Sequence, residues 1–399
     1  MAVLREDLEL SVVMPCLNEA KTVGVCVEKA LGAMREHGVC GEVVVSDNGS
    51  TDQSVEIAES HGARVVHCEK RGYGNALMAG IEAAHGRYVI MGDADDSYDF
   101  SKLGPFVEGL REGYDLVMGS RFRGGIMPGA MPWKNRYLGN PMLTRILNLF
   151  FRAGVSDVYC GLRGFTKDLY DRLHMRCPGM EFALEMVVKA SKLKVRVTEV
   201  PIVLHPDGRG RPPHLRPLQD GWRSLKFLLM FSPTYLFLVP GLVFLVAGLV
   251  LMGSQLLAAP GEFLWVFGRH MSFHWSILGS LLTLLAYQVI NVHFFARIYS
   301  VTHRFQEPDR FLTWSFRALT LERVLLVGVL VALLGAALDG RVLVSWIGTG
   351  YGPLVPGHTR LAVLGSTLIG LGVQTVSNAF FYSILGDGYT HTGSGVGES

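Results

Sequence analysis

Short apolar runs and amphipathic stretches alternate along the first half of the chain. Apolar runs bounded by turn residues are typical of buried strands, and they occur at residues 10–14, 41–46, 63–67, 87–91 and 115–119. The period of a helix recurs between them, at residues 21–36, from a cap at Ser50 or Thr51 to about residue 61, and at residues 74–84. Strands that alternate with helices predict an α/β domain with a mostly parallel sheet over residues 1–226.

The pattern changes after residue 227, where apolar residues dominate and charges become sparse. Crossing a bilayer takes about 20 predominantly apolar residues. Four stretches qualify, at residues 235–256, 275–295, 324–338 and 360–385, although the third is short unless flanking residues extend it. Gln374, Ser377 and Asn378 lie in the fourth and favour packing against neighbouring helices. A soluble protein could not readily bury four such runs in one half of its chain. We therefore predict an all-α membrane domain over residues 227–399.

The whole chain is close to neutral, with 37 Lys and Arg against 35 Asp and Glu, so bulk charge gives no indication of a nucleic-acid partner. The distribution of basic residues is more informative. Basic residues gather at 209–226 and 297–323, whereas the other two loops hold only Arg269, Arg341 and Arg360. The positive-inside rule therefore predicts that the N-terminal domain and both termini are cytoplasmic. Residues 1–9 are charged and lack an apolar core, so we expect no signal peptide.

Six cysteines lie in the N-terminal half, at positions 16, 26, 40, 68, 160 and 177. A cytoplasmic location would keep them reduced. They form no C-x-x-C pair, so we expect no zinc site and interpret them as buried small apolar residues.

Asp93-Ala94-Asp95 follows the apolar run at residues 88–92 directly. Two carboxylates at i and i+2, just past a strand, can point into one crevice at the end of a sheet. Hard divalent cations bind carboxylate oxygens, and such a cation can neutralise a leaving diphosphate. The same short pattern also occurs in ordinary solvated turns, so the surrounding motifs decide between the two interpretations.

Other polar residues follow the predicted strands in the same way, at Asn18, Glu19 and Asp47. Polar groups that recur at one edge of a parallel sheet are typical of a nucleotide site. No G-x-G-x-x-G follows the first strand and no Walker A lysine motif occurs, which disfavours a dehydrogenase or a P-loop enzyme. The glycine-rich segment at residues 71–75 is either a plain turn that starts a helix or a backbone that approaches a ligand closely.

Taken in order, these motifs resemble the family 2 glycosyltransferases of GT-A fold. They are Pro15-Cys16-Leu17-Asn18-Glu19, Asp47-Asn48-Gly49-Ser50-Thr51-Asp52, Arg71-Gly72-Tyr73-Gly74-Asn75, Asp93-Ala94-Asp95, Gly119-Ser120-Arg121, Asp157-Val158-Tyr159-Cys160-Gly161-Leu162-Arg163-Gly164-Phe165 and Glu199-Val200-Pro201-Ile202. Within the family, the set is similar to polyprenyl-phosphate sugar synthases of the dolichol-phosphate mannose or glucose synthase kind. The resemblance covers about residues 10–222.

The resemblance implies a role for each matching residue. Mg²⁺ or Mn²⁺ would be held by Asp93 and Asp95. The nucleotide sugar would be bound by Pro15, Asn18, Glu19, Asp47, Arg71, Gly72, Asp93, Arg209 and Arg211. The phosphate of a lipid acceptor would be bound by Arg121, Arg136 and Asn140. Catalysis would involve Asp95, Arg121 and Asp157.

Three positions depart from the family pattern. Asn48 stands where the family has a second aspartate, Tyr73 replaces the usual lysine, and Ser97 occupies a position where mannose-type relatives have a metal-binding glutamine. These departures leave the donor open between UDP-glucose and GDP-mannose, and they leave a third protein ligand of the metal open as well.

The chemistry follows from the groups themselves. A cation and an arginine would neutralise the leaving nucleoside diphosphate. The acceptor, a phosphate monoester, is already anionic near neutral pH, so it needs positioning by arginine more than deprotonation. We therefore expect direct displacement with inversion at the anomeric carbon and no obligatory base. Asp157 and Glu185 are either bases or orienting groups, or they form structural salt bridges.

Two segments combine apolar and basic residues, at 131–152 and 215–231. Such helices suit the surface of an anionic bilayer, although an ordinary amphipathic helix packed on the sheet has the same pattern. The segment from Arg209 to His214 is either a loop that closes on the donor or a solvated linker.

Three functions compete. The first is transfer of a hexose from a nucleotide sugar to polyprenyl phosphate at the cytoplasmic membrane face. For this function we expect no nucleic-acid partner, and the sequence leaves open whether the protein is a homo-oligomer. The second is a polysaccharide synthase or a transferase with another lipid acceptor, but the Q-x-x-R-W motif common there is absent and residues 220–223 do not match it. The third is a non-catalytic carrier or flippase subunit, which the sparse charges in the spans disfavour.

Overall fold

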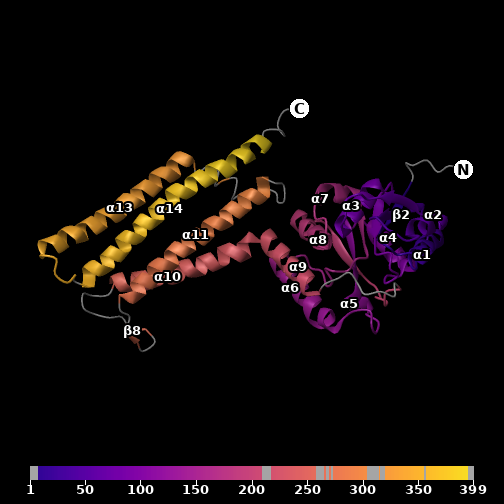
Figure 1. The fold of residues 1–399 in the computed structure, drawn as a ribbon, viewed down its shortest axis with the longest axis horizontal. Helices are drawn as coiled ribbons and strands as arrows, with labels where there is room; N and C mark the ends of the chain where they lie inside the picture. Colours follow the sequence, from indigo (N-terminus) through magenta and orange to yellow (C-terminus); the bar gives the residue numbers. More distant parts are fainter. Residues whose placement is uncertain are drawn as a thin grey trace. The chain divides into compact units, whose positions relative to one another are not determined.

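The computed structural model describes residues 8–208, 217–257, 265–266, 269–270, 273–302, 314, 320–354 and 356–393. The chain forms two compact units, the N-terminal unit Met1–Leu228 and the C-terminal unit Leu229–Ser399 (Figure 1). The N-terminal unit contains an α/β sheet, and the C-terminal unit consists mainly of long helices.

The N-terminal unit is built on a seven-stranded sheet with the order β3-β2-β1-β4-β6-β5-β7. Its strands are β1 Leu10–Cys16, β2 Gly41–Asp47, β3 Arg64–His67, β4 Tyr88–Met91, β5 Leu116–Ser120, β6 Arg163–Thr166 and β7 Val197–Pro201. Every neighbouring pair is parallel except the two that involve β6, which runs antiparallel to β4 and β5. The predicted mostly parallel sheet is confirmed. The strand prediction had omitted β6 and β7.

Helices alternate with most of these strands along the chain (Figure 1). They are α1 Val23–Glu36, α2 Ser54–Ser60, α3 Tyr73–Ala83, α4 Gly104–Arg111, α5 Arg121–Gly124, α6 Asn140–Phe151, α7 Lys167–Leu173, α8 Phe182–Leu193 and α9 Pro217–Phe231. The predicted cap of the second helix is wrong. Helix α2 begins only at Ser54, after Gln53. The Ser50 hydroxyl instead accepts a hydrogen bond from the backbone N–H of Asn18, 2.9 Å away, and so joins two loops.

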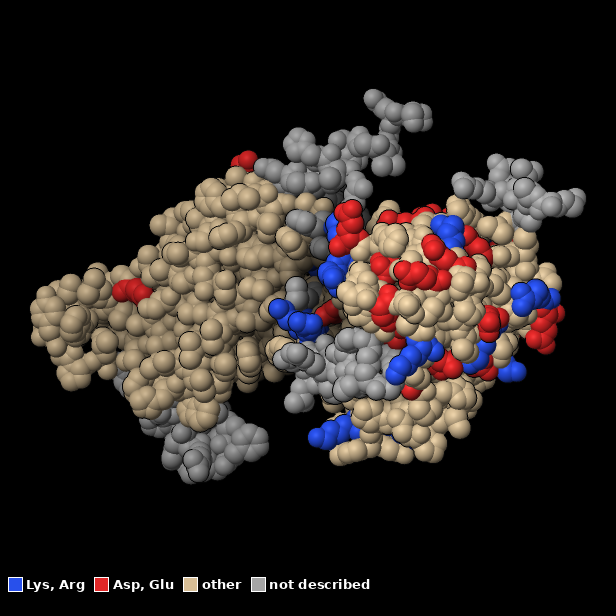
Figure 2. Space-filling view, turned by 45° about the vertical axis from the view of Figure 1, so that its right-hand side comes forward, with Lys and Arg blue, Asp and Glu red and all other residues tan. Residues whose placement is uncertain are grey.

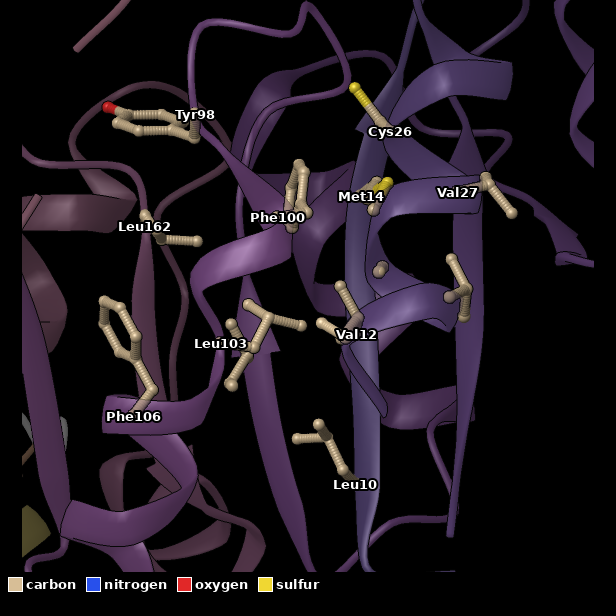
Figure 3. Close-up of a cluster of buried hydrophobic side chains, with 14 of the residues drawn as sticks. Leu10, Val12, Met14, Cys26, Val27, Tyr98, Phe100, Leu103, Phe106 and Leu162 are labelled. Carbon is tan, nitrogen blue, oxygen red and sulfur yellow. The ribbon is translucent and has the colours of Figure 1, made fainter. Parts of the chain in front are cut away.

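Strand β1 is buried over its whole length. Leu10, Val12 and Met14 belong to one apolar cluster that includes Phe100 from the loop after β4 (Figure 3). On the opposite face Gly80 of α3 lies so close to β1 that an added Cβ would stand 2.6 Å from a methyl carbon of Val13. Because helices cover both faces, the central strands lack the polar alternation of a half-exposed sheet. This explains why short continuous apolar runs predicted them.

The six cysteines are all free thiols in the structure. Cys16, Cys26 and Cys160 are buried as predicted, and burial raises the pKa of Cys26 to about 12, with a smaller contribution from the charge of Asp96. The prediction is wrong for Cys40, which is exposed just before β2, and Cys68 and Cys177 are only partly buried.

The C-terminal unit contains four candidate membrane spans, Thr234–Leu256, His274–Thr302, Leu321–Gly348 and Gly357–Leu385. They belong to α10 Val239–Leu257 with the π-helical turn Thr234–Leu238 before it, α11 His274–Thr302, α13 Leu321–Gly348 and α14 Pro356–Gly393. The four predicted spans are confirmed, and flanking residues extend the third from 15 predicted residues to 28. Figure 2 shows many charged side chains on the visible face of the N-terminal unit and few on that of the C-terminal unit.

Small residues let α13 and α14 approach closely. A Cβ at Gly335 would stand 2.5 Å from the carbonyl oxygen of Gly365, and one at Gly372 would stand 2.6 Å from the backbone nitrogen of Ala332. Helix α14 also meets α11, where the hydroxyls of Ser280 and Thr367 lie 2.6 Å apart. Close backbone approach and hydroxyl hydrogen bonds are typical of helix association in membranes. The predicted packing of the fourth span against its neighbours is confirmed.

Candidate active site at the carboxyl edge of the sheet

Strands β1, β2, β4 and β5 all point in one direction, so their carboxyl ends meet at one edge of the sheet. The strands end at Cys16, Asp47, Met91 and Ser120. The predicted residues Asn18, Glu19, Asp47, Asp93, Asp95 and Arg121 therefore all lie at or just beyond this edge. Because β6 is antiparallel, the segment that precedes it, which contains Asp157, reaches the same edge.

Asp93 and Asp95 are each oriented by a hydroxyl group. The Asp95 side chain is buried, and its Oδ1 accepts hydrogen bonds from the backbone N–H of Ser97 at 3.1 Å and from the Ser97 hydroxyl at 2.6 Å. The Asp93 Oδ1 accepts a hydrogen bond from the Tyr73 hydroxyl at 2.8 Å. Ser97 and Tyr73, two of the three departures from the family pattern, thus both contact the paired aspartates.

Backbone contacts fix the loop that carries this pair. The Thr22 hydroxyl donates to the carbonyl oxygen of Ala94 at 2.7 Å, and the Gly208 N–H donates to that of Asp95 at 3.0 Å. Lys29 on α1 binds the Asp96 carboxylate at 2.6 Å. Thr22 could not be predicted as part of the site, since its partner lies 72 residues away and a buried threonine near a helix start has no distinctive pattern.

The aspartate pair fits a hard divalent cation. Two carboxylates from one short loop are a common protein contribution to a Mg²⁺ site, in which waters and substrate phosphates complete the coordination. Within the described part of the chain, no group of three or more His, Cys, Asp and Glu side chains could hold a metal ion. Asp93 and Asp95 thus remain the predicted protein ligands of the metal.

The loop after β2 is tied to the loop after β1. The Asp47 carboxylate accepts hydrogen bonds from the backbone N–H groups of Gly49 at 3.1 Å and Ser50 at 3.0 Å. Burial alone would raise the pKa of Asp47, but hydrogen bonding with the Ser50 hydroxyl and with these two backbone groups lowers it overall. The side-chain oxygen of Asn18, whose φ is 58°, accepts from the Thr51 N–H at 2.7 Å. Asn18 and Asp47 are thus brought together, and both shape the loops that contain them.

Three further predicted nucleotide-binding residues lie nearby. Pro15 is buried within β1. Glu19 is 7% exposed, and its backbone N–H donates to the Ser54 hydroxyl at 2.7 Å. Arg71 is exposed, and its guanidinium carbon lies 3.2 Å from the position that a Cβ on Gly49 would occupy. Arg71 therefore extends over the loop after β2.

The glycine-rich turn before α3 approaches protein rather than open space. A Cβ at Gly72, whose φ is 136°, would stand 2.4 Å from the carbonyl oxygen of Pro178, and one at Gly74 would stand 2.1 Å from that of Cys177. The backbone N–H groups of Gly74 and Asn75 both donate to Pro178, at 2.9 and 3.3 Å. The interpretation as a plain helix start accounts for these glycines.

Arg121 and Asp157 form a buried ion pair. The Asp157 carboxylate accepts from Nε of Arg121 at 2.6 Å, from Nη2 at 2.7 Å and from the backbone N–H at 3.1 Å, while Asp157 is fully buried and Arg121 is 7% exposed. Burial alone would lower the pKa of Arg121, but interactions with Tyr98 and Asp157 raise it overall. Glu185 is likewise fully buried and pairs with Lys189 at 2.7 Å. Both carboxylates are thus in the salt bridges considered for them.

The remaining predicted residues lie elsewhere or outside the described residues. Arg136 lies in the π-helical turn Asn135–Gly139, and its Nη1 donates to the Ile126 carbonyl oxygen at 3.4 Å. Asn140 begins α6 and contacts the Met131 sulfur at 3.6 Å. These contacts do not include the Arg121–Asp157 pair. Arg209 and Arg211 lie outside the described residues.

Two family profiles match the chain. One, described as "Glycosyl transferase family 2", matches residues 11–173. The other, described as "Glycosyltransferase family 2 C-terminal transmembrane region", matches residues 294–386. The first profile contains β1 to α7 and most of the predicted site, and the second contains α13 and most of α14.

Several known proteins are similar to the chain. The low-salt glycan biosynthesis hexosyltransferase Agl6 of Haloferax volcanii is 37% identical over 379 residues, which cover 95% of this chain and 89% of that protein. The dolichyl-phosphate hexose transferase of the same organism is 30% identical over 197 residues, which cover 49% of this chain and 82% of that protein. Among solved structures, glucosyl-3-phosphoglycerate synthase from Mycobacterium tuberculosis matches at 21% identity with a TM-score of 0.44, over 56% of this chain and 79% of that one.

Proposed function

The chain belongs to glycosyltransferase family 2 and is a membrane-bound glycosyltransferase, and from this premise we propose that it transfers one hexose from a nucleotide sugar to a polyprenyl phosphate. The donor in this proposal is UDP-glucose or GDP-mannose. The observation that carries the proposal is the aspartate pair at the carboxyl edge of the sheet, the edge that the buried Arg121–Asp157 pair also occupies. The similarity to the dolichyl-phosphate hexose transferase of Haloferax volcanii supports a lipid phosphate as the acceptor.

In this proposal Asp93 and Asp95 hold Mg²⁺ or Mn²⁺ against the diphosphate of the donor. The bound cation supplies charge neutralisation for the departing nucleoside diphosphate. Ser97 and Tyr73 orient the two carboxylates, and the contacts of Thr22 keep their loop fixed, so little reorganisation accompanies the reaction. Asn18, Asp47 and Arg71 line the neighbouring loops that would receive the nucleotide.

The acceptor phosphate requires a cation rather than a base. Asp157 already accepts three hydrogen bonds from Arg121 and is fully buried, so it serves as a positioning residue. Since Nε and Nη2 of Arg121 are occupied by Asp157, Nη1 is the nitrogen that would meet an acceptor phosphate. Arg136 and Asn140 are further candidates for the same phosphate, although in the structure they contact the Ile126 carbonyl oxygen and the Met131 sulfur. Direct displacement with inversion at the anomeric carbon follows.

We also propose that α6 and the turn before it lie on the bilayer surface. Trp133 is 67% exposed, Tyr137 69% and Leu149 63%, whereas Leu143 and Leu147 on the inner face are buried. Large exposed apolar side chains interspersed with arginine and lysine are typical of interfacial helices. Trp222 on α9, 63% exposed, extends the same argument to the second predicted segment. The basic residues of the loops support a cytoplasmic position for this surface and for both termini.

The proposal is tested by a transfer experiment on the full-length protein in detergent. Labelled UDP-glucose, GDP-mannose and other nucleotide sugars are each incubated with polyprenyl phosphate and Mg²⁺ or Mn²⁺, and the lipid is extracted. We expect label in a lipid product that mild acid releases, from one donor far more than from the others. Absence of lipid label with every donor would refute the proposed function.

A further inference from the structure

Two of the three departures from the family pattern act on one short segment at the start of α3. We propose that Tyr73 is a positioning residue for the metal-binding carboxylate of Asp93, and that Asn48 holds Tyr73 in the required place. The inference rests on the proposed function, because it takes Asp93 as a metal ligand.

The first step is the contact itself. The Tyr73 hydroxyl donates to Oδ1 of Asp93 at 2.8 Å, from the first residue of α3 to the loop after β4. Groups that hydrogen-bond to a metal-binding carboxylate fix its orientation and tune its affinity for the metal. A phenol donates this hydrogen bond while staying neutral, so Asp93 keeps its full negative charge for the cation. A lysine at this position would instead bring a positive charge that competes with the cation.

The second step is the support of Tyr73. The Asn48 amide nitrogen donates to the carbonyl oxygens of Lys70 at 2.8 Å and Cys68 at 3.3 Å, and its amide oxygen accepts from the Gly72 N–H at 2.8 Å. Asn48 is 6% exposed, so water cannot replace these hydrogen bonds. An aspartate would accept from Gly72 but could not donate to the two carbonyl groups. The residue type at position 48 therefore determines whether the segment before Tyr73 is held.

The third step is the opposite side of the same segment. Pro178 accepts hydrogen bonds from the N–H groups of Gly74 and Asn75, directly after Tyr73. The backbone of residues 70–75 is thus held by Asn48 on one side and by Pro178 on the other. With its backbone held on both sides, Tyr73 can fix the Asp93 carboxylate.

The experiment measures Mn²⁺ binding by electron paramagnetic resonance on the full-length protein, with UDP and with GDP present. We expect Tyr73→Phe, which removes only the hydroxyl, to raise the Mn²⁺ Kd by about 10-fold to 100-fold. Transfer by this variant should recover its kcat when Mn²⁺ is saturating. Asn48→Asp should raise the Mn²⁺ Kd as well. The Kd of the double variant should not exceed the higher of the two single-variant Kd values, because both substitutions disturb one interaction.

Tyr170→Phe is the matched control. Tyr170 is a buried tyrosine on α7 that stacks on Phe165 with ring centroids 6.0 Å apart. Its substitution should leave the Mn²⁺ Kd unchanged. A Tyr73→Phe Kd equal to that of the wild type would overturn the inference, as would an equal weakening by Tyr170→Phe. Asp93→Ala separates the two proposals. If that variant binds Mn²⁺ normally, the metal assignment itself fails. If it loses Mn²⁺ while Tyr73→Phe binds normally, only the inference fails.

Discussion

Removal of the Asp157 carboxylate should destabilise the N-terminal unit much more than an ordinary surface substitution. In Asp157→Ala the guanidinium of Arg121 loses both carboxylate contacts, at 2.6 and 2.7 Å, while it remains 93% buried. The variant thus leaves a buried charge without its partner. Breaking one side of a buried ion pair typically costs about 3–5 kcal/mol. For a domain of this size that cost corresponds to a fall in Tm of about 6–20 °C.

Unfolding can be followed through the thiols of the full-length protein in detergent. A thiol-reactive dye labels the exposed Cys40 at once, whereas Cys16, Cys26 and Cys160 react only when the N-terminal unit opens. The temperature of this second phase gives an apparent Tm. Asp168→Ala is the matched control, because Asp168 also pairs with an arginine, Arg172. In this salt bridge the Asp168 side chain is 79% exposed and the Arg172 side chain 48% exposed. Loss of an exposed pair of this kind changes stability by less than about 1 kcal/mol.

The double variant Arg121→Met with Asp157→Leu provides a second readout. It removes both charges and keeps apolar volume, and such replacements of buried pairs are often neutral or stabilising. Its Tm should therefore lie above that of Asp157→Ala, although transfer should be lost. Well below its Tm, Asp157→Ala should transfer slowly rather than not at all, since its effect reaches the substrate through Arg121. If Asp157→Ala and Asp168→Ala shifted Tm equally, the buried pair would not have the importance assigned to it.

Three further predictions concern the metal loop, acid stability and the membrane helices. Asp95→Ala should abolish transfer with Mg²⁺ or Mn²⁺, and wild-type turnover that persists in chelator would contradict the metal assignment. The pKa of Asp47 in the folded protein is lowered below its ordinary value of 3.8. The hydrogen bonds of its carboxylate therefore stabilise the fold above that pH, and this stabilisation is lost as the pH falls. Asp47→Asn should accordingly flatten the decline of Tm between about pH 5 and pH 3. Gly335→Val should destabilise the C-terminal unit by about 1–3 kcal/mol in detergent unfolding, because the added Cβ would meet Gly365. Gly340→Val on the same helix should not, because a Cβ there would have nothing within 4 Å.

Some elements were beyond prediction because burial there depends on distant partners. Strand β6 contains Arg163 and Gly164, which interrupt any apolar pattern. Arg163 is nevertheless fully buried, because it donates to the carbonyl oxygens of Val158, Cys160 and Ala183. Those acceptors exist only once the segment before β6 and helix α8 are in place. No local property of the sequence indicates that such an arginine can enter a strand.

The amino-acid sequence was enough to predict the α/β domain, the four spans and the edge at which Asp93 and Asp95 lie. Local patterns suffice for these features, because the period of apolar residues reports which faces are buried and parallel strands bring their carboxyl ends together. Which side chains contact one another at this edge is known only from the folded structure. Thr22 binds Ala94 across 72 residues, Arg121 binds Asp157 across 36, and Tyr73 binds Asp93 across 20. Such contacts depend on strand order and on loop conformation, which periodicity does not encode.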